Sequence, residues 1–286
     1  MKRLLIVGAG GMTGTALTRH ALAADWDVTA LTRDNLDIGD AVQVAESTRR
    51  ARPDVVINAA GYTAVDAAEN ARDAAMRVNR DGAANLAQSA AEAGAAIVHI
   101  SSDYVFDGES ATPYAPDAEP HPVSAYGESK LAGEQAVRMH NQRHTIVRTS
   151  WVYSHTGDNF LRTMLRLAAD GKEIRVVDDQ HGSPTCASDL AVALLRVASL
   201  VANNADVGGT YHFTNSGSTT WCGFARAIFE ERRNSAIIVR PIATREYPTA
   251  ARRPRYSVLD TSAFTSAFGR QPRPWRDALR STLELL

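Results

Sequence analysis

The segment LLIVGAGGMTG, residues 4–14, decides the fold of this chain of 286 residues. Residues 4–7 are all apolar, which is typical of a strand buried on both faces of a parallel sheet. Gly8, Gly11 and Gly14 follow at once, and an apolar periodic stretch from Met12 to Ala24 predicts a helix. Glycines at this junction let the backbone approach a pyrophosphate, whose charge the helix N-terminus attracts. The segment therefore predicts a dinucleotide-binding turn.

Strand-like and helix-like stretches alternate as far as residue 150. This alternation predicts an α/β fold of the Rossmann type, in which a doubly wound parallel sheet has right-handed crossovers. We assign residues 1–150 to this dinucleotide-binding domain. Strands are expected at 27–31, 54–60, 95–100 and 145–150, and helices at 41–51, at about 72–93 and from Ser124 onward.

The pattern loosens after Trp151. Spread turns, aromatic residues and arginines predict a smaller lobe over residues 151–286 that closes over a polar, anionic substrate, with some of this chain returning to the first domain. Helices are expected at 160–169, 187–199 and 219–232 and near the C-terminal end, short strands at 174–177, 210–213 and 237–239, a polar turn at 178–185, and a basic extended segment at 252–260.

Charge and cysteine content exclude several classes of protein. The chain has 31 basic and 32 acidic residues, so neither a nucleic acid nor an anionic membrane is expected as a partner. Cys186 and Cys222 are too few for a disulfide framework, which favours reduced thiols and a cytoplasmic protein. The apolar run near the N-terminus is too short for a signal peptide, and no later run is long enough to cross a membrane.

The segment SAYGESKLAGE, residues 124–134, carries the candidate chemistry. Ser124 is expected to cap a helix on which Tyr126 and Lys130, four residues apart, share one face. An ammonium beside a phenol lowers the phenol's pKa from about 10, so that the tyrosine could exchange a proton near neutral pH. A surface helix with a chance pair of these residues is the alternative.

The position of this helix favours the catalytic interpretation. In doubly wound sheets, ligands lie beyond the carboxyl ends of the strands. Gly8, Ala59, Ser101-Ser102 and Ser150-Trp151 all fall at that edge, where the Tyr126 helix also begins. A serine hydroxyl and the phenol can therefore converge on one carbonyl oxygen.

The end of the second strand bears on the choice of cofactor. A NAD-binding protein usually places an acid here to bind the ribose hydroxyls. This chain has Thr32-Arg33-Asp34, in which Arg33 could pair with a 2′-phosphate and so favours NADPH, while Asp34 leaves NADH open. A solvated loop arginine is the alternative for Arg33. Asp37-Ile38 lies where the chain could pass the adenine.

Together these features resemble an extended short-chain dehydrogenase/reductase, and within that group the dTDP-4-dehydrorhamnose reductase family, over essentially the whole chain. The general marks are the glycine turn, NAAGY at 58–62, Val78-Asn79 and the Tyr126/Lys130 pair. More specific marks, which point to nucleotide-sugar 4-ketoreductases, are YTAVDAAE at 62–69, SSDYVFDG at 101–108, YGESKLAGE at 126–134, DDQHGSPT at 178–185 and RPRYSVLD at 253–260.

The resemblance implies a reaction. NADPH, or NADH, would deliver hydride to the C4 carbonyl of a dTDP-4-keto-6-deoxyhexose, and the family product is dTDP-L-rhamnose. Tyr126 would protonate the alkoxide, Lys130 would hold the nicotinamide ribose, and Ser102, where the family usually has threonine, would hydrogen-bond the carbonyl oxygen. A dTDP-sugar is thus the expected partner.

The resemblance also implies binding residues. The cofactor would contact Gly8, Gly10, Gly11, Met12, Gly14, Arg33, Asp37, Ile38, Ala59, Ala60, Gly61, Tyr62, Asn79, Ser101, Tyr126 and Lys130. The substrate would contact Ser102, Asp103, Tyr104, Trp151, Gln180, Thr185, Trp221 and Arg253, although Trp221 could equally be a core residue.

Some relatives form metal-bridged dimers through acidic side chains, one of them on the first helix. That helix reads Thr15-Ala16 here, so we expect no metal and leave monomer and homodimer open. The sequence leaves one rival function open and disfavours two others. A sister reductase acting on another dTDP-keto sugar stays open, whereas intact Ser102, Tyr126 and Lys130 disfavour a regulatory subunit like that of methionine adenosyltransferase. An epimerase or dehydratase is disfavoured because Ser102 is followed by Asp103-Tyr104, without the glutamate that dehydration would need.

Overall fold

A six-stranded parallel sheet forms the centre of the molecule. The computed structural model describes residues 1–171, 173–234 and 236–286. All neighbouring strands of this sheet pair in parallel, in the order β10-β5-β4-β3-β1-β2, which confirms the predicted Rossmann-type α/β fold. The strands are β1 (Arg3–Val7), β2 (Asp27–Leu31), β3 (Val55–Asn58), β4 (Ala96–Ser102), β5 (His144–Thr149) and β10 (Gly209–His212).

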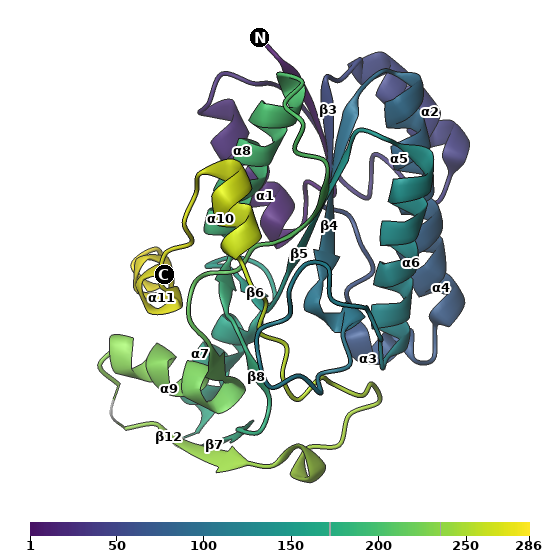
Figure 1. Ribbon diagram of the computed structural model, residues 1–286. Helices are drawn as coiled ribbons and strands as arrows, with labels where there is room; N and C mark the ends of the chain where they lie inside the picture. Colours follow the sequence, from purple (N-terminus) through teal and green to yellow (C-terminus); the bar gives the residue numbers. More distant parts are fainter. Residues whose placement is uncertain (172, 235) are drawn as a thin grey trace.

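Helices cover both faces of the sheet, which explains why β1 is apolar throughout. Successive side chains of a strand point to opposite faces. Leu4 and Ile6 pack in one core cluster with α1 (Met12–Leu22) and α8 (Ala187–Ala202). Leu5 and Val7 pack in another, with α2 (Ala41–Ala51) and α5 (Gly82–Glu92). Figure 1 shows α1 and α8 on one side of the sheet, and α2, α5 and α6 (Ala125–His140) on the other.

The helix expected from Arg72 to Ala93 is interrupted. It runs as α4 (Arg72–Met76), a π-helical turn (Arg77–Asp81) and α5. A π turn places one extra residue in a helix and is frequently found at functional sites. The centre of this turn is the buried Asn79, whose carbonyl oxygen lies only 2.2 Å from where a Cβ on Gly133 of α6 would stand. The interruption therefore brings Asn79 against the helix that carries Tyr126.

The second lobe has its own small core, built around Tyr153, Leu161, Phe224 and Trp275. The polar turn expected at 178–185 contains two short strands, β8 (His181–Gly182) and β9 (Thr185–Cys186), which pair with β11 (Thr219–Thr220) and β6 (Val152–Tyr153). The other elements of this lobe are α7 (Phe160–Asp170), β7 (Glu173–Val177), α9 (Trp221–Glu231), β12 (Ile238–Ile242), a 3₁₀ turn (Thr244–Glu246) and α11 (Trp275–Leu283). Helix α10 (Ser262–Phe268) instead packs, through Phe264 and Phe268, in the core of the large sheet.

The segment of residues 247–260, which we call the return segment, runs from the small lobe back to the large one. It forms isolated bridges from Tyr256 to His181 and from Leu259 to Tyr114. Short helices α3 (Val65–Ala68) and Asp103–Val105 lie on the large-lobe side of the same region. None of the helices in the described ranges has the length and apolarity needed to cross a bilayer. Cys186 and Cys222 are separate, buried thiols.

Candidate active site

The three glycines of the turn after β1 have different roles. Gly8 has a φ of +84°, and a Cβ there would stand 2.4 Å from the Ala60 nitrogen. A Cβ on Gly14 would stand 2.0 Å from the Gly8 carbonyl oxygen. These two glycines allow β1, β3 and α1 to pack closely. A Cβ on Gly11 would meet nothing nearer than the Gly8 oxygen at 3.5 Å, so packing within the protein does not require glycine there.

Gly10 and Gly11 are exposed at the start of α1, and Met12 is half-buried beside them. Gly11 occupies the N-cap position and offers no side chain to the N–H groups of the first turn. An exposed backbone at a helix N-terminus suits a pyrophosphate. The residues present therefore fit the phosphates of a dinucleotide, and Gly11 is the glycine whose absence of a side chain the ligand would exploit.

Gly14→Ala and Gly11→Ala are expected to separate packing from binding. Gly14→Ala should lower the free energy of unfolding by about 1–3 kcal/mol, because its Cβ overlaps backbone atoms. Gly11→Ala should lower the free energy of unfolding by no more than about 1 kcal/mol, the cost of alanine at an N-cap, and raise Kd for NADPH roughly tenfold. Thermal melts and fluorescence titration with NADPH measure both quantities. Equal NADPH affinity in Gly11→Ala and the unaltered protein would contradict the placement of the pyrophosphate.

The loop after β2 carries the residues predicted to face the adenosine half of the cofactor. Arg33 is exposed immediately after the strand. Asp37 pairs with Arg77, whose hydrogen bond holds the pKa of that carboxyl below its usual range. The Ile38 side chain is buried, and a Cβ on Gly82 would stand 2.5 Å from it. The carbonyl oxygen of Ile38 accepts a hydrogen bond from Asn85 at 2.9 Å, so a contact between Ile38 and an adenine stays a prediction.

The segment after β3 lies beside the glycine turn. Ala59 and Ala60 are the residues that a Cβ on Gly8 would strike. Gly61 is exposed, and a Cβ on it would stand 4.0 Å from the Lys130 Nζ atom. This places the glycine turn, the end of β3 and the Lys130 ammonium along one edge of the sheet, as the sequence predicts.

Asn79 holds parts of the site together. Its side-chain oxygen accepts the Tyr62 N–H at 2.8 Å, and its amide nitrogen donates to the Tyr62 carbonyl oxygen at 3.1 Å and to the Ser129 hydroxyl at 2.8 Å. These bonds tie the segment after β3 to the second turn of α6. In this structure Asn79 positions its neighbours, and a direct contact between its side chain and the cofactor stays a prediction.

The first turn of α6 is fixed from two sides. The Ser124 hydroxyl accepts the Gly127 N–H at 3.2 Å, which confirms the predicted cap. The Glu69 carboxylate on the chain after α3 accepts the Ala125 N–H at 2.8 Å. A carboxylate at a helix N-terminus is stabilised by the positive end of the helix dipole. Sequence analysis missed Glu69 because nothing local to it indicates which N–H it would reach.

Tyr126 is buried in the first turn of α6, with the Tyr104 ring edge-on at a centroid distance of 5.3 Å. Burial raises the pKa of its phenol to about 12, contact with the Ser102 hydroxyl opposes this rise, and Asp103 adds to it. The expectation that Lys130 would bring this pKa toward neutrality is wrong, because the loss of hydration dominates. A phenol that stays protonated at pH 7 is suited to donate a proton rather than to accept one.

Lys130 is buried one turn further along α6. Its Nζ atom donates to the Ile100 carbonyl oxygen at 2.7 Å, which directs the ammonium to β4. Burial lowers the pKa of Lys130 to about 8, and the Glu134 carboxylate opposes this change. At neutral pH the ammonium therefore remains mostly charged.

The end of β4 supplies the hydroxyl predicted to bind a carbonyl oxygen. Ser102 donates to the Asp103 carboxylate at 2.9 Å and accepts the Tyr104 N–H at 3.2 Å. Asp103 is fully enclosed, and burial raises its pKa to about 6, although hydroxyls of Ser257 and Ser102 oppose this. The buried Ser101 hydroxyl makes no hydrogen bond of good geometry among the residues described, but it lies near the Glu134 carboxylate and helps to lower its pKa. A contact between Ser101 and the cofactor stays a prediction.

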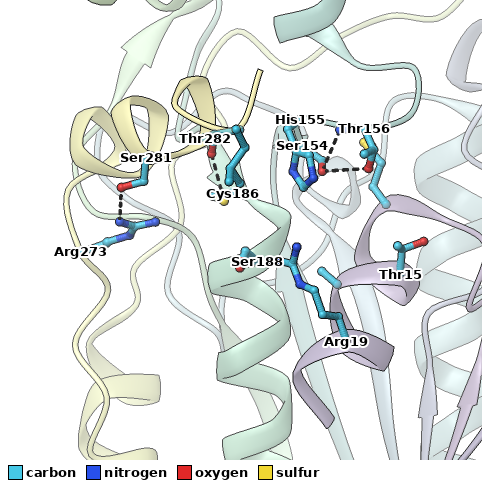
Figure 2. Close-up of a pocket in the computed structure, with 13 residues that line it drawn as sticks. Thr15, Arg19, Ser154, His155, Thr156, Cys186, Ser188, Arg273, Ser281 and Thr282 are labelled. Atoms are coloured by element: carbon cyan, nitrogen blue, oxygen red, sulfur yellow. Dashed lines mark hydrogen bonds between the residues drawn. The ribbon is translucent and has the colours of Figure 1, made fainter. Parts of the chain in front are cut away.

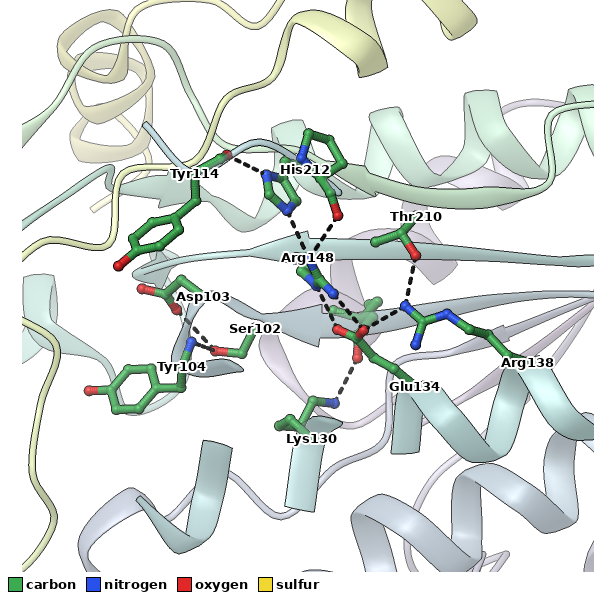
Figure 3. A network of polar contacts seen from close by, with 12 residues as sticks. Ser102, Asp103, Tyr104, Tyr114, Lys130, Glu134, Arg138, Arg148, Thr210 and His212 are labelled. Atoms are coloured by element: carbon green, nitrogen blue, oxygen red, sulfur yellow. Dashed lines mark hydrogen bonds and ion pairs between the residues drawn. The ribbon is translucent and has the colours of Figure 1, made fainter. Parts of the chain in front are cut away.

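A buried ionic network supports α6 behind these groups (Figure 3). Glu134 receives two hydrogen bonds from Arg148 on β5, at 2.7 and 2.8 Å, and one from Arg138 at 2.8 Å. Burial alone would raise the pKa of Glu134, but the hydrogen bonds and charge of Arg148 outweigh it and lower the pKa to about 2. Arg148 also contacts His212 of β10 at 3.4 Å. The network thus joins α6, β5 and β10.

Two tryptophans lie face to face at the border of the second lobe. Trp151 has a φ of +46° and stacks on Trp221 with ring centroids 3.6 Å apart and an angle of 8°. A Cβ on Gly182 would stand 2.5 Å from the Trp151 indole, so this stack depends on glycine there. Phe160 also packs on Trp221 at 4.7 Å. Both indoles are half-exposed, so Trp221 is neither fully a core residue nor fully free for a ligand.

The remaining predicted substrate residues make protein contacts. Gln180 is buried and donates to the Thr244 hydroxyl at 3.0 Å. Thr185 is fully buried, and its N–H donates to the Trp151 carbonyl oxygen at 3.1 Å. These two residues support the tryptophan pair and the 3₁₀ turn at 244, and their contact with a substrate stays a prediction. Arg253 pairs with Asp66 at 2.7 Å.

A separate cavity of about 120 Å³ lies between α1, α8 and α11 (Figure 2). Its wall includes Thr15, Arg19, Ser188 and Arg273 but, of the predicted site residues, only Met12. The cavity is therefore distinct from the converging groups around Tyr126. Within the described ranges, no three His, Cys, Asp or Glu residues are grouped so that they could hold a metal ion.

Comparisons with known proteins agree with this geometry. The sequence pattern of the family described as "RmlD substrate binding domain" matches residues 1–286. A dTDP-4-dehydrorhamnose reductase of Sinorhizobium fredii is 42% identical over 283 residues, which are 97% of this chain and 95% of the relative.

Two solved structures are also similar over nearly their whole length. A dTDP-4-dehydrorhamnose reductase of Clostridium acetobutylicum has a TM-score of 0.94 and 39% identity, with 100% of this chain and 99% of the other covered. The Bacillus anthracis enzyme of the same name, in complex with NADP, has a TM-score of 0.95 and 37% identity, with 100% of both chains covered. The protein therefore belongs to the dTDP-4-dehydrorhamnose reductase family.

Proposed function

We propose that this protein reduces the C4 keto group of a dTDP-4-keto-6-deoxyhexose with NADPH, converting dTDP-4-dehydro-L-rhamnose to dTDP-L-rhamnose. The observation that carries the proposal is the convergence of Ser102, Tyr126 and Lys130 at the sheet edge that also holds the glycine turn. The names of the full-length relatives and the NADP complex of one of them support the choice of substrate and cofactor.

The cofactor, when bound, supplies the hydride. The glycine turn would hold its pyrophosphate, Arg33 its 2′-phosphate, and Lys130 the ribose next to the nicotinamide. NADH would use the same turn without the contact to Arg33. These residues orient the cofactor, which carries the redox chemistry itself.

The chain's own contribution to the reaction is to bind the carbonyl oxygen and to provide a proton. The Ser102 hydroxyl would hydrogen-bond the oxygen and stabilise the negative charge that develops on it. The Tyr126 phenol, held neutral by burial, would donate its proton to the resulting alkoxide. The Lys130 ammonium would then lie close enough to stabilise the phenolate left behind.

The substrate would be bound between the lobes. We assign the sugar to Tyr104, Trp151 and Trp221, and the thymidine diphosphate to Arg253 and the residues from Gln180 to Thr185. We assign the enzyme to the cytoplasm, because its two cysteines are buried thiols that form no disulfide and its substrate would be a free dTDP-sugar. It would be active as a monomer or as a homodimer.

The test is NADPH oxidation in the presence of dTDP-4-keto-6-deoxyglucose, with and without the 3,5-epimerase that makes the rhamnose precursor. Oxidation only with the epimerase supports the proposed reaction. Oxidation without it would identify a sister reductase that acts on the unepimerised sugar. No oxidation in either arm, with NADPH still bound, would reject a reductase of this substrate.

Arg33→Asp is expected to change the choice of cofactor. Loss of the guanidinium and gain of a carboxylate should lower the ratio of kcat/KM for NADPH to that for NADH by roughly tenfold or more, since the carboxylate repels a 2′-phosphate and can bind ribose hydroxyls. Steady-state kinetics with each cofactor measures the ratio. An unchanged ratio in Arg33→Asp would show that Arg33 faces solvent.

A further inference from the structure

Asp66 on the short helix α3 holds the return segment against the large lobe. Its two carboxylate oxygens accept hydrogen bonds from Arg253, at 2.9 Å from Nη1 and 2.7 Å from Nη2. One of these oxygens also accepts the Ala251 N–H at 3.0 Å. The hydrogen bond from Arg253 holds the pKa of Asp66 below its usual range, so this carboxylate is charged at neutral pH. Asp66 therefore binds both the side chain and the backbone of the return segment.

The donors of Arg253 can be counted. A guanidinium has five N–H groups in one plane. The Asp66 carboxylate accepts one N–H from each Nη atom, and the Ala251 carbonyl oxygen accepts the second N–H of Nη1 at 3.2 Å. Within the described part of the chain, no acceptor is assigned to Nε–H or to the second Nη2–H. These two donors are parallel and form the side fork of the guanidinium, which can bind two oxygens of a phosphate at once.

The surroundings of Arg253 point to the active site. Burial raises the pKa of the Tyr104 phenol, and the charge of Arg253 opposes this rise. The Tyr104 ring in turn lies edge-on to Tyr126, with the centroids 5.3 Å apart. The Arg253 side chain is 22% exposed. It is thus enclosed enough to have a fixed direction and open enough to meet a ligand.

We propose that Asp66 is a positioning residue for substrate binding. By accepting hydrogen bonds from both Nη atoms of Arg253, it orients the guanidinium so that the side fork, Nε–H and the second Nη2–H, faces the diphosphate of the nucleotide sugar. This inference rests on the proposed function for the identity of the anion. It differs from a role for Asp66 in stability alone, because it requires a selective effect on the diphosphate ligand. Arg253 would be the residue that contacts the substrate, and Asp66 would act only through it.

The test compares Asp66→Asn with the unaltered protein, with dTDP as the probe. Asparagine keeps the shape of the side chain but loses the charge and one of the two acceptors that fix the guanidinium. Kd for dTDP, measured by calorimetry, should rise roughly five- to tenfold, and KM for the dTDP-keto sugar should rise with it. Kd for NADPH and kcat at saturating substrate should stay unchanged.

Glu109→Gln is the matched control. It breaks the neighbouring exposed ion pair between Glu109 and Arg252 of the same return segment, at 3.1 Å, and should leave dTDP affinity as it is. Arg253→Ala and the double variant complete a thermodynamic cycle. If Asp66 acts through Arg253, adding Asp66→Asn to Arg253→Ala should produce no further loss of dTDP affinity.

Three results would overturn the inference. The first is dTDP affinity in Asp66→Asn equal to that of the unaltered protein. The second is an equal loss of dTDP and NADPH affinity together with a lower melting temperature, which would identify a purely structural contact. The third is additive loss in the double variant. If the unaltered protein binds no dTDP, the proposed substrate class fails together with this inference. Selective dTDP loss without turnover of the keto sugar would support the inference and reject only the proposed reaction.

Discussion

Tyr126→Phe is expected to lower kcat by about two or more orders of magnitude, the loss typical of removing a general acid. The substitution removes one hydroxyl and keeps the ring that packs against Tyr104. The phenol lies next to the Ser102 hydroxyl, and burial keeps it protonated at neutral pH. Steady-state NADPH oxidation with the dTDP-keto sugar measures the effect. Kd for NADPH should change far less than kcat, because the glycine turn that would bind the pyrophosphate is untouched.

Tyr211→Phe provides the control for this substitution. The Tyr211 hydroxyl makes only a long contact of 3.5 Å to the Gly208 carbonyl oxygen, at the outer strand of the sheet. Its loss should leave kcat unchanged. Turnover by Tyr126→Phe within a few-fold of the unaltered protein would reject Tyr126 as the donor. A water-mediated route through Asp103, the other buried acid at this position, would then be the next mechanism to test.

Glu134→Gln should lower the free energy of unfolding by about 3–5 kcal/mol, because it leaves the Arg148 guanidinium buried without a countercharge. Both side chains are almost completely enclosed, at 0% and 2% exposure. The charge of Arg148 cannot reach water without opening the contact between α6 and β5. Urea unfolding followed by circular dichroism measures the change.

The control lies on the same helix. Glu128 pairs with Arg72 at 2.9 Å, but these side chains are 38% and 56% exposed. Glu128→Gln should therefore cost about 0–1 kcal/mol. Glu134→Gln combined with Arg148→Met removes both charges and should recover part of the loss. A cost for Glu134→Gln as small as that for Glu128→Gln would show that water reaches Arg148 in solution.

The parts of the molecule that the sequence predicted are those set by neighbouring residues. The apolar run at residues 4–7 and the glycines after it specify a buried strand and a tight turn wherever they occur in an α/β chain. Ser124 and the spacing of Tyr126 and Lys130 similarly depend only on helix geometry. These local patterns are enough to define the sheet, the turn and the positions of the catalytic candidates.

The parts that the sequence did not predict depend on residues far apart in the chain. The π turn at Asn79 places its carbonyl oxygen against Gly133 of another helix. Glu69 reaches Ala125 across 56 residues, and Asp66 reaches Arg253 across 187. The pKa of Tyr126 was predicted in the wrong direction because an i, i+4 neighbour is visible in sequence, whereas enclosure by the rest of the fold is not. Arg148, within the predicted strand TIVRTS at residues 145–150, indicates a buried ion pair. Its partner Glu134 could not be identified from that strand alone.

The outermost strand of the sheet has a consequence for synthesis. β10 lies beside β5, although residue 209 leaves the ribosome long after residue 149. Until then the nascent chain presents an open edge along β5 and lacks α8, the helix that covers one face. Such an edge can pair with other chains. The first half therefore exposes this edge and this face until residues 187–212 have been made, and a nascent chain stalled before residue 212 is expected to be a target for chaperones.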